Sequence, residues 1–292
     1  MSLHTQLLII DPQNDFCDLP QDACPTDSRS GARPGDRIRP ALPVPGAHAD
    51  MQRLAAFIAA QGDAIDAITI TLDSHHRWDI AHPGFWRQGD GGPVAPFAEI
   101  TAAQLRQGRF MTADTSAGAR AQAYLDALEA QGRYTLMVWP VHCQIGSWGH
   151  AIHADVLAAC NGWEDRRQRA VQAVFKGSNP WTEHYSAVQA EVPDPQDAET
   201  GLNLALLARL NAARRIYIAG EAGSHCVKAT TEHLVAHLPG GRPDRLVLLT
   251  DGMSAVAGFE AQQASFFDAM RAAGVGTSTL AELMRGGLEI GG

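Results

Sequence analysis

The chain has 292 residues, of which 45% are hydrophobic, and its formal net charge is −9. This length and apolar content suit one large α/β domain with insertions, and we expect residues 1–292 to form it. The negative charge disfavours nucleic acid or an anionic membrane as the main partner. No apolar run reaches the roughly 20 residues of a membrane span, and the N-terminus lacks the basic segment of a signal peptide.

The five cysteines stand at wide spacing and include no C-x-x-C pair. Such a pattern is not a disulfide framework, and it favours a reducing, cytoplasmic compartment. Parallel-sheet proteins of this size often self-associate, so we expect a homo-oligomer, although no stretch of the sequence indicates an interface.

Strands are predicted where β-branched and apolar runs end in turn residues. In chain order these runs are 7–10, 64–72, 134–138, 170–175, 215–219 and 246–250. Apolar residues at helical spacing predict helices over 46–61, 148–160, 198–213, 224–238 and 258–273. Two long segments, about 17–46 and 84–132, are predicted as insertions, the first a loop rich in Pro, Asp and Gly and the second with a helical part over 101–131.

The alternation of strands and helices predicts a three-layer αβα fold with a mostly parallel central sheet of about six strands. Ligands bind such sheets beyond the carboxyl ends of the strands. Asp11, Asp73, Lys176 and Cys226 stand at or just after such ends, and His142 lies in the loop beyond a further strand. We therefore expect these residues to meet at one edge of the sheet.

Cys226 lies where a strand passes into a helix, beside unpaired N–H groups and the positive end of the helix dipole. This position favours a thiolate and can hold an oxyanion. Asp11, at the end of a buried strand, can accept a proton, and Lys176 can lower the pKa of a nearby thiol. Together the three resemble a cysteine-hydrolase triad with Asp as the base. The simpler alternatives are an inert core thiol, a turn-forming aspartate before Pro12 and a surface lysine.

A second group combines Asp73 and His75, which directly follow a strand, with His142 from another loop. One carboxylate and two or three imidazoles suit a single divalent ion, with Zn²⁺ as the first choice and Fe²⁺ or Mn²⁺ as alternatives. His82 is a possible fourth ligand. Weaker candidates are His76, Asp79 and His150. The alternative is that these are loop histidines bonded to backbone or water.

Six short motifs resemble, in order, those of the isochorismatase-like cysteine hydrolases, and among these the nicotinamidase/pyrazinamidase branch. They span about residues 5–285 and are Asp11-x-Gln13-Asn14-Asp15-Phe16, Asp73-x-His75, Trp139-Pro140-x-His142-Cys143, Phe175-Lys176-Gly177, Tyr185-Ser186-Ala187 and Gly220-x-Ala222-x-Ser224-His225-Cys226-Val227. The Trp-Pro-x-His-Cys and Asp-x-His motifs carry most of the specificity.

The resemblance implies a role for each matched residue. Cys226 would be the nucleophile, Asp11 the base and Lys176 the cation of the triad. Asp73, His75 and His142, with His82 at a slightly longer spacing, would hold a metal that binds the ring nitrogen of a pyridine. Phe16, Trp139 and His225 would line the substrate pocket. A cis peptide is expected at Ala222-Gly223, and the N–H groups of Gly223 and Cys226 would form the oxyanion hole.

These implications favour an amidohydrolase that converts a small carboxamide, nicotinamide in the first place, to an acid and ammonia through a Cys thioester. The chain departs from the family at Gly223-Ser224, where relatives carry Thr-Asp, and in its longer segments at 17–46 and between Asp73 and Trp139. Two alternatives stay open. One is a metal-independent hydrolase of another amide or of a vinyl ether, and the other is a catalytically silent binding homologue.

Overall fold

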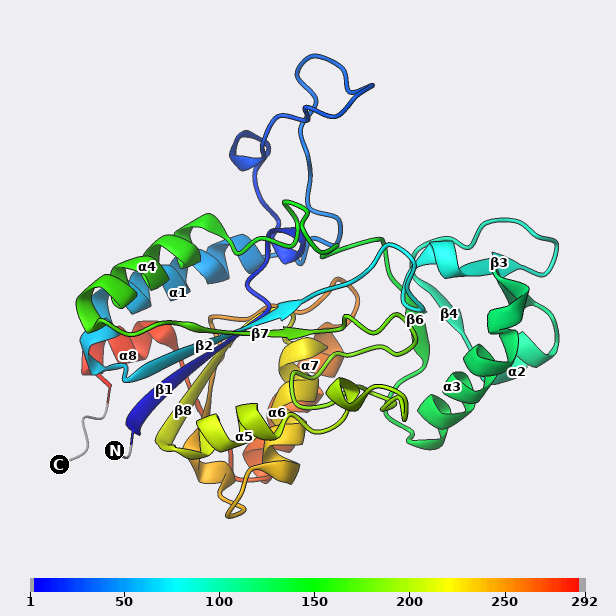
Figure 1. Ribbon diagram of the computed structural model, residues 1–292. Coiled ribbons are helices and arrows are strands. Elements are labelled where there is room, and N and C mark those ends of the chain that lie inside the picture. The colour runs from blue at the N-terminus through cyan, green and yellow to red at the C-terminus, as the bar shows by residue number, and fades with distance from the viewer. Residues whose placement is uncertain (1–2, 289–292) are drawn as a thin grey trace.

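The computed structural model describes residues 3–288. Its centre is a six-stranded sheet in the order β10-β9-β8-β1-β2-β7, in which every neighbouring pair is parallel (Figure 1). The strands are β1 (Leu3–Ile10), β2 (Ala67–Asp73), β7 (Gln172–Lys176), β8 (Ala213–Gly220), β9 (Leu246–Leu249) and β10 (Gly276–Ser278). This confirms the predicted parallel sheet of about six strands.

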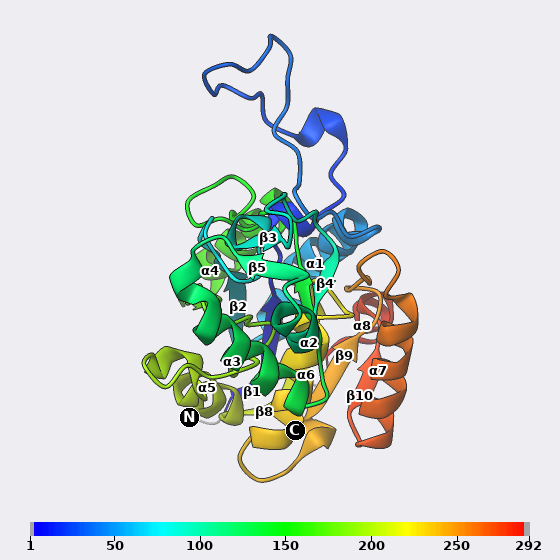
Figure 2. The same cartoon turned by 90° about the vertical axis from the view of Figure 1, so that its right-hand side faces the viewer.

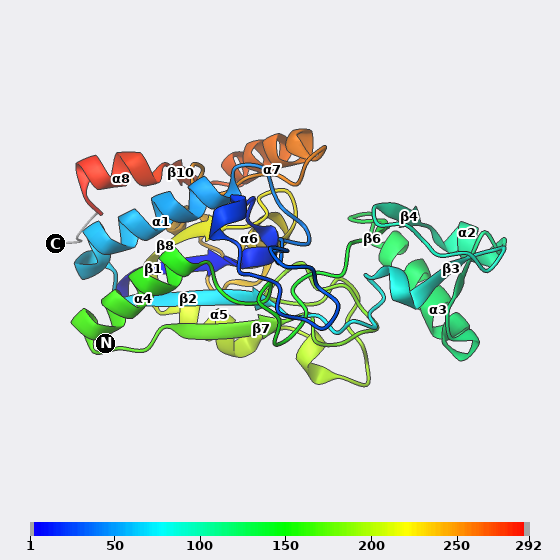
Figure 3. The same cartoon turned by 90° about the horizontal axis from the view of Figure 1, so that it is seen from above.

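Helices cover both faces of the sheet and complete the predicted three layers (Figures 1 and 3). One face carries α1 (Ala47–Gln61), α4 (Ala154–Arg167) and α8 (Leu280–Gly286). The other face carries α5 (Leu204–Asn211), α6 (Cys226–His237) and α7 (Glu260–Ala272). Because both faces are covered, the second half of the central strand β1 is apolar without alternation, and Leu7 to Ile10 are fully buried.

The segment 80–138, which precedes α4, forms a small unit with its own hydrophobic core, which lies beyond the carboxyl ends of the strands (Figures 2 and 3). Its elements are β3 (Trp86–Gln88), β4 (Ala98–Ile100), α2 (Ala102–Arg106), β5 (Phe110–Thr112), α3 (Gly118–Ala130) and β6 (Leu136–Val138). The strands pair antiparallel as β3-β5 and β4-β6. This insertion therefore contains strands that the prediction for this segment lacked.

One strand of the predicted sheet is misassigned. The run 134–138 does form a strand, β6, but it pairs with β4 of the insertion and not with the central sheet. The sixth place in the sheet is taken by β10, whose three residues are too few to show a period. An apolar run predicts a strand but not the strand with which it pairs. The partner of β6 is β4, which lies in the insertion.

Residues 17–46 form a loop that projects from the body of the molecule, blue in Figure 1. Its two ends are held together, since the N–H of Leu42 donates to the carbonyl of Asp15 at 3.0 Å and that of Val44 to Phe16 at 2.9 Å. The loop therefore leaves and re-enters the fold next to Phe16.

All five cysteines have free thiols, as the predicted absence of a disulfide framework requires. Across residues 3–288, no helix has both the length and the apolar composition needed to cross a bilayer.

Candidate functional site

Four neighbouring strands, β8, β1, β2 and β7, bring the predicted site residues to one edge of the sheet. Asp11 directly follows β1, Asp73 ends β2 and Lys176 ends β7, while Cys226 begins α6 after the turn that follows β8. In the β2-β7 register Asp73 is directly opposite Lys176. Parallel strands end at the same edge, so this arrangement follows from the order of the strands.

The Lys176 ammonium lies at the centre of this group. Its Nζ lies 2.9 Å from Asp11 Oδ2 and 2.9 Å from Asp73 Oδ1. It also lies 3.6 Å from Cys226 Sγ, and it donates to the carbonyl oxygen of His184 at 3.0 Å. All the side chains involved are buried. The structure thus brings the three residues of the predicted triad into mutual contact.

Asp11 is oriented by its neighbour on β2. Its φ of 45° lies in the left-handed region, which is uncommon for residues other than glycine but tolerated by Asp. Its N–H donates to the Thr71 carbonyl at 3.1 Å, and the Thr71 hydroxyl donates to Asp11 Oδ1 at 2.5 Å. Oδ1 is therefore held by Thr71, while Oδ2 faces Lys176.

Two glycines of the motifs are explained by close packing. A Cβ on Gly220 would lie 1.9 Å from the carbonyl oxygen of Ile10, so only glycine lets β8 end against β1. Gly177 has a φ of +82°, and a Cβ there would lie 3.0 Å from Asp73 Oδ1. Both positions allow the backbone to approach the site closely.

Burial shapes the charges of the three residues. It raises the pKa of the Asp11 carboxyl, and Lys176 offsets this only in part. Burial also raises the pKa of the Cys226 thiol well above its usual value, because the opposing effect of Lys176 is outweighed. Burial disfavours the Lys176 ammonium, but Asp11 and Asp73 reverse this and raise its pKa. The prediction that Cys226 favours a thiolate is wrong for the resting protein. A thiolate there would be a buried negative charge next to the carboxyl groups of Asp11 and Asp73, which is costly.

The turn before Cys226 corrects two further expectations. The cis peptide lies between Glu221 and Ala222, one residue earlier than predicted. The N–H of Gly223 donates to the carbonyl of Ser254 at 2.7 Å and is not available to a ligand. The hydrogen bonds between β8 and β1 continue to this point, with the N–H of Glu221 donating to the carbonyl of Ile10 at 2.7 Å. Ala222 thus replaces Gly223 as the companion of Cys226 in a candidate oxyanion hole.

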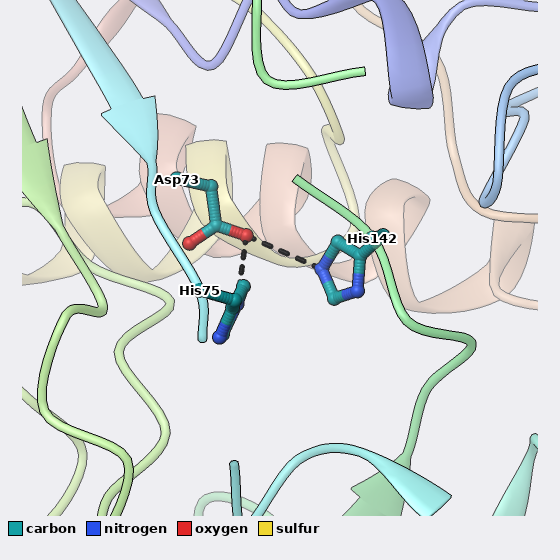
Figure 4. Close-up of side chains that lie close together, drawn as sticks. All are labelled: Asp73, His75 and His142. Carbon is teal, nitrogen blue, oxygen red and sulfur yellow. Dashed lines mark hydrogen bonds and ion pairs between the residues drawn. The ribbon is translucent and has the colours of Figure 1, made fainter. Parts of the chain in front are cut away.

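A cluster of one carboxylate and two imidazoles lies beside Lys176 (Figure 4). Asp73 Oδ2 lies 3.1 Å from His75 Nε2 and 3.3 Å from His142 Nε2. One potential ligand atom from each of the three residues lies within 4.8 Å of the others, and all three side chains are buried. Asp73 therefore links the two groups, with one oxygen facing Lys176 and the other facing the imidazoles.

The partners of the imidazoles test whether this cluster fits a metal ion. His75 Nδ1 lies 3.0 Å from Asp79 Oδ2, and His142 Nδ1 lies 2.9 Å from the carbonyl oxygen of Pro140. With a metal bound, these acceptors would keep the protons on Nδ1, and both Nε2 atoms, which face Asp73, would be available as ligands, the usual arrangement around protein-bound metals. The donor set fits a divalent ion such as Zn²⁺.

His82 lies next to the cluster without belonging to the three-residue set. Its Nε2 lies 3.3 Å from His142 Nδ1, and its Nδ1 donates to the carbonyl of His76 at 3.0 Å. Burial, together with His75 and His142, lowers the pKa of His82 to about 2, so its ring is neutral. Of the weaker candidates, Asp79 orients His75.

The other two weaker candidates have different surroundings. His76 is exposed, and only its backbone carbonyl takes part, as the acceptor for His82. His150 Nε2 lies 2.9 Å from the Ser74 hydroxyl, and its ring stacks on Phe175. Neither residue belongs to the three-residue cluster.

Charges inside the cluster are strongly coupled. Burial opposes the ionised form of Asp73, but His75 and Lys176 outweigh it and hold the pKa well below its usual value. Burial likewise opposes the imidazolium of His75, yet Asp73 and Asp79 raise its pKa well above the usual value. The carboxylates of the cluster thus favour a positive charge at His75, and they would favour a bound cation for the same reason.

A small pocket has Cys226, Asp73 and His142 in its wall. The three predicted pocket residues, Phe16, Trp139 and His225, all line it. The remaining lining residues are Leu42, Glu183, Tyr185, Ala222 and Val256. The His225 ring meets Trp139 edge to face, with 5.1 Å between the centroids, and lies tilted against Tyr185 at 5.4 Å. The Trp139 indole N–H donates to the Tyr185 hydroxyl at 3.0 Å.

Glu183 is a pocket residue that the sequence analysis missed. It is 3% exposed, its N–H donates to the Tyr124 hydroxyl, and its Oε1 accepts the N–H of His184. Burial raises the pKa of its carboxyl. Glu183 stands two residues before the Tyr185 motif, and no local pattern distinguishes it from a surface acid.

No family model matches the chain, and no curated protein matches it in sequence. Solved structures do match. A nicotinamidase-pyrazinamidase of Acinetobacter baumanii has 17% identity and a TM-score of 0.60, covering 96% of this chain and 98% of that chain. The chain has the isochorismatase-like fold.

Two further structures share this isochorismatase-like fold. The zinc complex of the Pyrococcus horikoshii pyrazinamidase has 18% identity and a TM-score of 0.51, covering 94% of this chain and 99% of that chain. An isochorismatase-like hydrolase from Alkaliphilus metalliredigens has 14% identity and a TM-score of 0.50, covering 97% and 98%. The fold that the six motifs implied is thus confirmed.

Proposed function

We propose that the protein is an amidohydrolase that cleaves a small ring carboxamide through a thioester on Cys226. The observation that carries the proposal is the Lys176 ammonium, which lies 2.9 Å from Asp11 and 3.6 Å from the Cys226 sulfur. A thiol, an acid and a fixed cation in mutual contact at the wall of a pocket supply a nucleophile, a base and a counter-charge.

The first half of the reaction forms the thioester. Asp11 takes the proton of the Cys226 thiol as the sulfur attacks the carboxamide carbon, so a free thiolate is never needed. The raised pKa of Asp11 makes it a better proton acceptor. The N–H groups of Ala222 and Cys226 hold the oxyanion. Asp11 then returns the proton to the departing nitrogen, the C–N bond breaks and ammonia leaves.

The second half restores the cysteine. Asp11 takes a proton from a water molecule whose oxygen attacks the thioester carbon. The C–S bond breaks, the acid product leaves, and Asp11 protonates the sulfur. Lys176 stays charged throughout, since Asp11 and Asp73 raise its pKa, and it stabilises the negative charge that passes between Asp11 and the sulfur.

Asp73, His75 and His142 would hold a divalent ion, which supplies a Lewis-acid position for a ring nitrogen of the substrate. His82 lies next to this cluster, with its Nε2 facing His142. Since Asp73, His142 and Cys226 line one pocket, a substrate with a ring nitrogen at one end and a carboxamide at the other would face both groups. The aromatic walls suit a planar ring. Nicotinamide and pyrazinamide have this form, and structures with the same fold carry these activities in their names.

The test is ammonia release from a panel of carboxamides that includes nicotinamide and pyrazinamide, with and without added Zn²⁺, Fe²⁺ or Mn²⁺. We expect wild type to release ammonia and Cys226→Ala to release none above background. The matched control is Cys160→Ala, which removes another buried free thiol, on α4 away from the pocket. It should retain activity. A Cys226→Ala variant with full activity would exclude the thioester route.

A further inference from the structure

Glu221, the first residue of the turn 221–226 that leads to Cys226, has a buried acidic side chain. Its side chain is 0% exposed. Oε2 accepts the N–H of Ser254 at 3.1 Å. Oε1 is also buried and has no hydrogen-bond partner among residues 3–288. A carboxylate oxygen without a donor is costly to bury, so this group requires an explanation.

The explanation lies in a second carboxyl group, Asp50, which is within hydrogen-bonding contact of Glu221. Asp50 Oδ2 accepts the hydroxyl of Ser254 at 2.5 Å, and Oδ1 pairs with the Arg53 guanidinium. Asp50 also lies in the first turn of α1, where the helix dipole favours a negative charge. Two buried carboxyl groups in contact must share a proton, and the donors already bound to Asp50 leave Glu221 as the carrier of that proton.

We propose that Glu221 is a positioning residue that carries this shared proton, donates it to Asp50, and thereby holds the turn 221–226 in place beneath the pocket. The proton supplies a donor between two carboxyl groups that would otherwise both be acceptors. The oxyanion role of this turn rests on the proposed function, whereas the shared proton does not.

Ser254 transmits the effect to the turn. It donates its N–H to Glu221 and its hydroxyl to Asp50, and its carbonyl accepts the N–H of Gly223 at 2.7 Å. Two residues further on, the N–H of Val256 donates to the Ser224 hydroxyl at 3.1 Å. The carboxyl pair, the loop after β9 and the turn 221–226 are thus one hydrogen-bonded unit, and its members Ala222 and Val256 line the pocket.

The surrounding charges support a protonated Glu221. Burial raises its pKa well above the usual value, and Asp50 and Asp18 raise it further. The other titratable groups in this region are the Cys17 thiol and the Arg53 guanidinium, and Arg53 is engaged by Asp50. Because Arg53 is paired with Asp50, it does not offset the effect of burial on Glu221.

A proton count tests the proposal without any substrate. The unfolded carboxyl ionises near pH 4.5, whereas the folded one keeps its proton to higher pH. Wild type must therefore lose stability relative to Glu221→Gln as the pH rises above about 4.5. Denaturant unfolding at several pH values should show the ratio of the unfolding constants, wild type over variant, rising about tenfold per pH unit. Gln remains neutral and can make both hydrogen bonds. A ratio that does not change with pH would overturn the proposal.

The matched control is Glu164→Gln on α4. Glu164 also accepts a backbone N–H from another segment, that of Val171 at 2.6 Å, but at the opposite end of the sheet from the site. We expect no comparable rise in its ratio between pH 5 and 7. In infrared spectra, the C=O stretch of protonated carboxylic acids should be weaker in Glu221→Gln than in wild type and in Glu164→Gln, since other buried carboxyl groups such as Glu183 and Glu191 also contribute to it. Its presence at equal strength in Glu221→Gln would count against Glu221 as the proton carrier.

Kinetics test the positioning role separately. Glu221→Leu loses the bond to Ser254, and we expect kcat to fall on the order of 100-fold with KM little changed, because the oxyanion donors are displaced. Glu221→Gln should restore kcat to within a few-fold of wild type. A Leu variant with normal kcat would refute the positioning role. If no carboxamide is hydrolysed by wild type, the proposed function fails, and the proton count still decides the state of Glu221.

Discussion

The two halves of the site are built in different ways. Asp11, Lys176 and Cys226 stand at the ends of neighbouring parallel strands or on the helix that follows one, so the sheet register fixes their separation. His75 and His142 stand on loops, and His142 follows a strand that pairs within the insertion. Asp73 belongs to both halves, with one oxygen for each.

This difference teaches where the site can vary. Moving a residue at a strand end requires a change of register, which would turn whole strands over, whereas a loop residue can shift with its own segment. We therefore expect the sheet half to be sensitive to charge and the loop half to be sensitive to orientation. Four predictions test this contrast, in order of decreasing effect.

The largest effect is expected from Lys176→Met. It leaves Asp11 and Asp73 buried without their shared cation, and breaking such a buried pair costs about 3–5 kcal/mol. Urea denaturation should show this loss, and ammonia release should fall to background. The control is Lys228→Met, whose partner Glu232 is partly exposed and whose loss should cost about 1 kcal/mol or less. An equal loss of unfolding free energy in the two variants would show that the buried carboxylates at the strand ends do not depend on Lys176.

The next effect concerns pH. Asp11 acts only when ionised, and burial raises its pKa above the usual value for Asp. Activity is thus present above this pKa and is lost as the pH falls through it. The acidic limb of kcat/KM should lie above pH 4, the range of an ordinary Asp. Thr71→Val removes a hydrogen bond that lowers this pKa and should move the limb to higher pH. A limb that stays in place in this variant would argue against Asp11 as the titrating base.

For the loop half, the sharpest change is Asp79→Asn. Asp79 is not one of the three clustered residues but faces His75 Nδ1 at 3.0 Å. Loss of such an orienting carboxylate weakens metal binding by about 10–100-fold. Competition with a chromophoric chelator measures the affinity directly. Asp90→Asn, at an exposed turn of the insertion, should bind Zn²⁺ like wild type. Unchanged affinity in Asp79→Asn would show that His75 needs no orientation.

The smallest effect is expected at the insertion itself. Phe97 is 54% exposed and meets Trp139 edge-on, with 6.0 Å between ring centroids. Phe97→Ala should raise KM a few-fold, since an aromatic pair contributes about 0.5–1.5 kcal/mol, and it should leave kcat unchanged. Met111→Ala, also exposed on the insertion, should change neither constant. A loss of kcat in Phe97→Ala would mean that the insertion also acts on the sheet half.

Much of the site was predictable because strand ends are visible in sequence. The apolar run before Asp11 is continuous, as a parallel strand buried on both faces requires, and β-branched or apolar runs also precede Asp73 and Lys176, so the residue that ends each run stands out. The histidine cluster was predicted by type and spacing, but the sequence could not separate the three clustered residues from His82. That separation depends on how the loop after Asp73 folds against the segment that carries His142.

Other features were decided only by tertiary contacts. The loss of Gly223 as a donor depends on Ser254, which is far away in sequence. Glu183 and Glu221 look like ordinary acids until the fold buries one at the pocket wall and the other against Asp50.

The sequence by itself determined the parallel sheet and the residue types at its edge, because hydrophobic periodicity and strand punctuation are local properties. The tertiary structure decided which neighbours each charge would meet. It is for this reason that the resting state of Cys226 was mispredicted: a pKa depends on burial and on charges that arrive from other strands, and neither is written in the residues next to it.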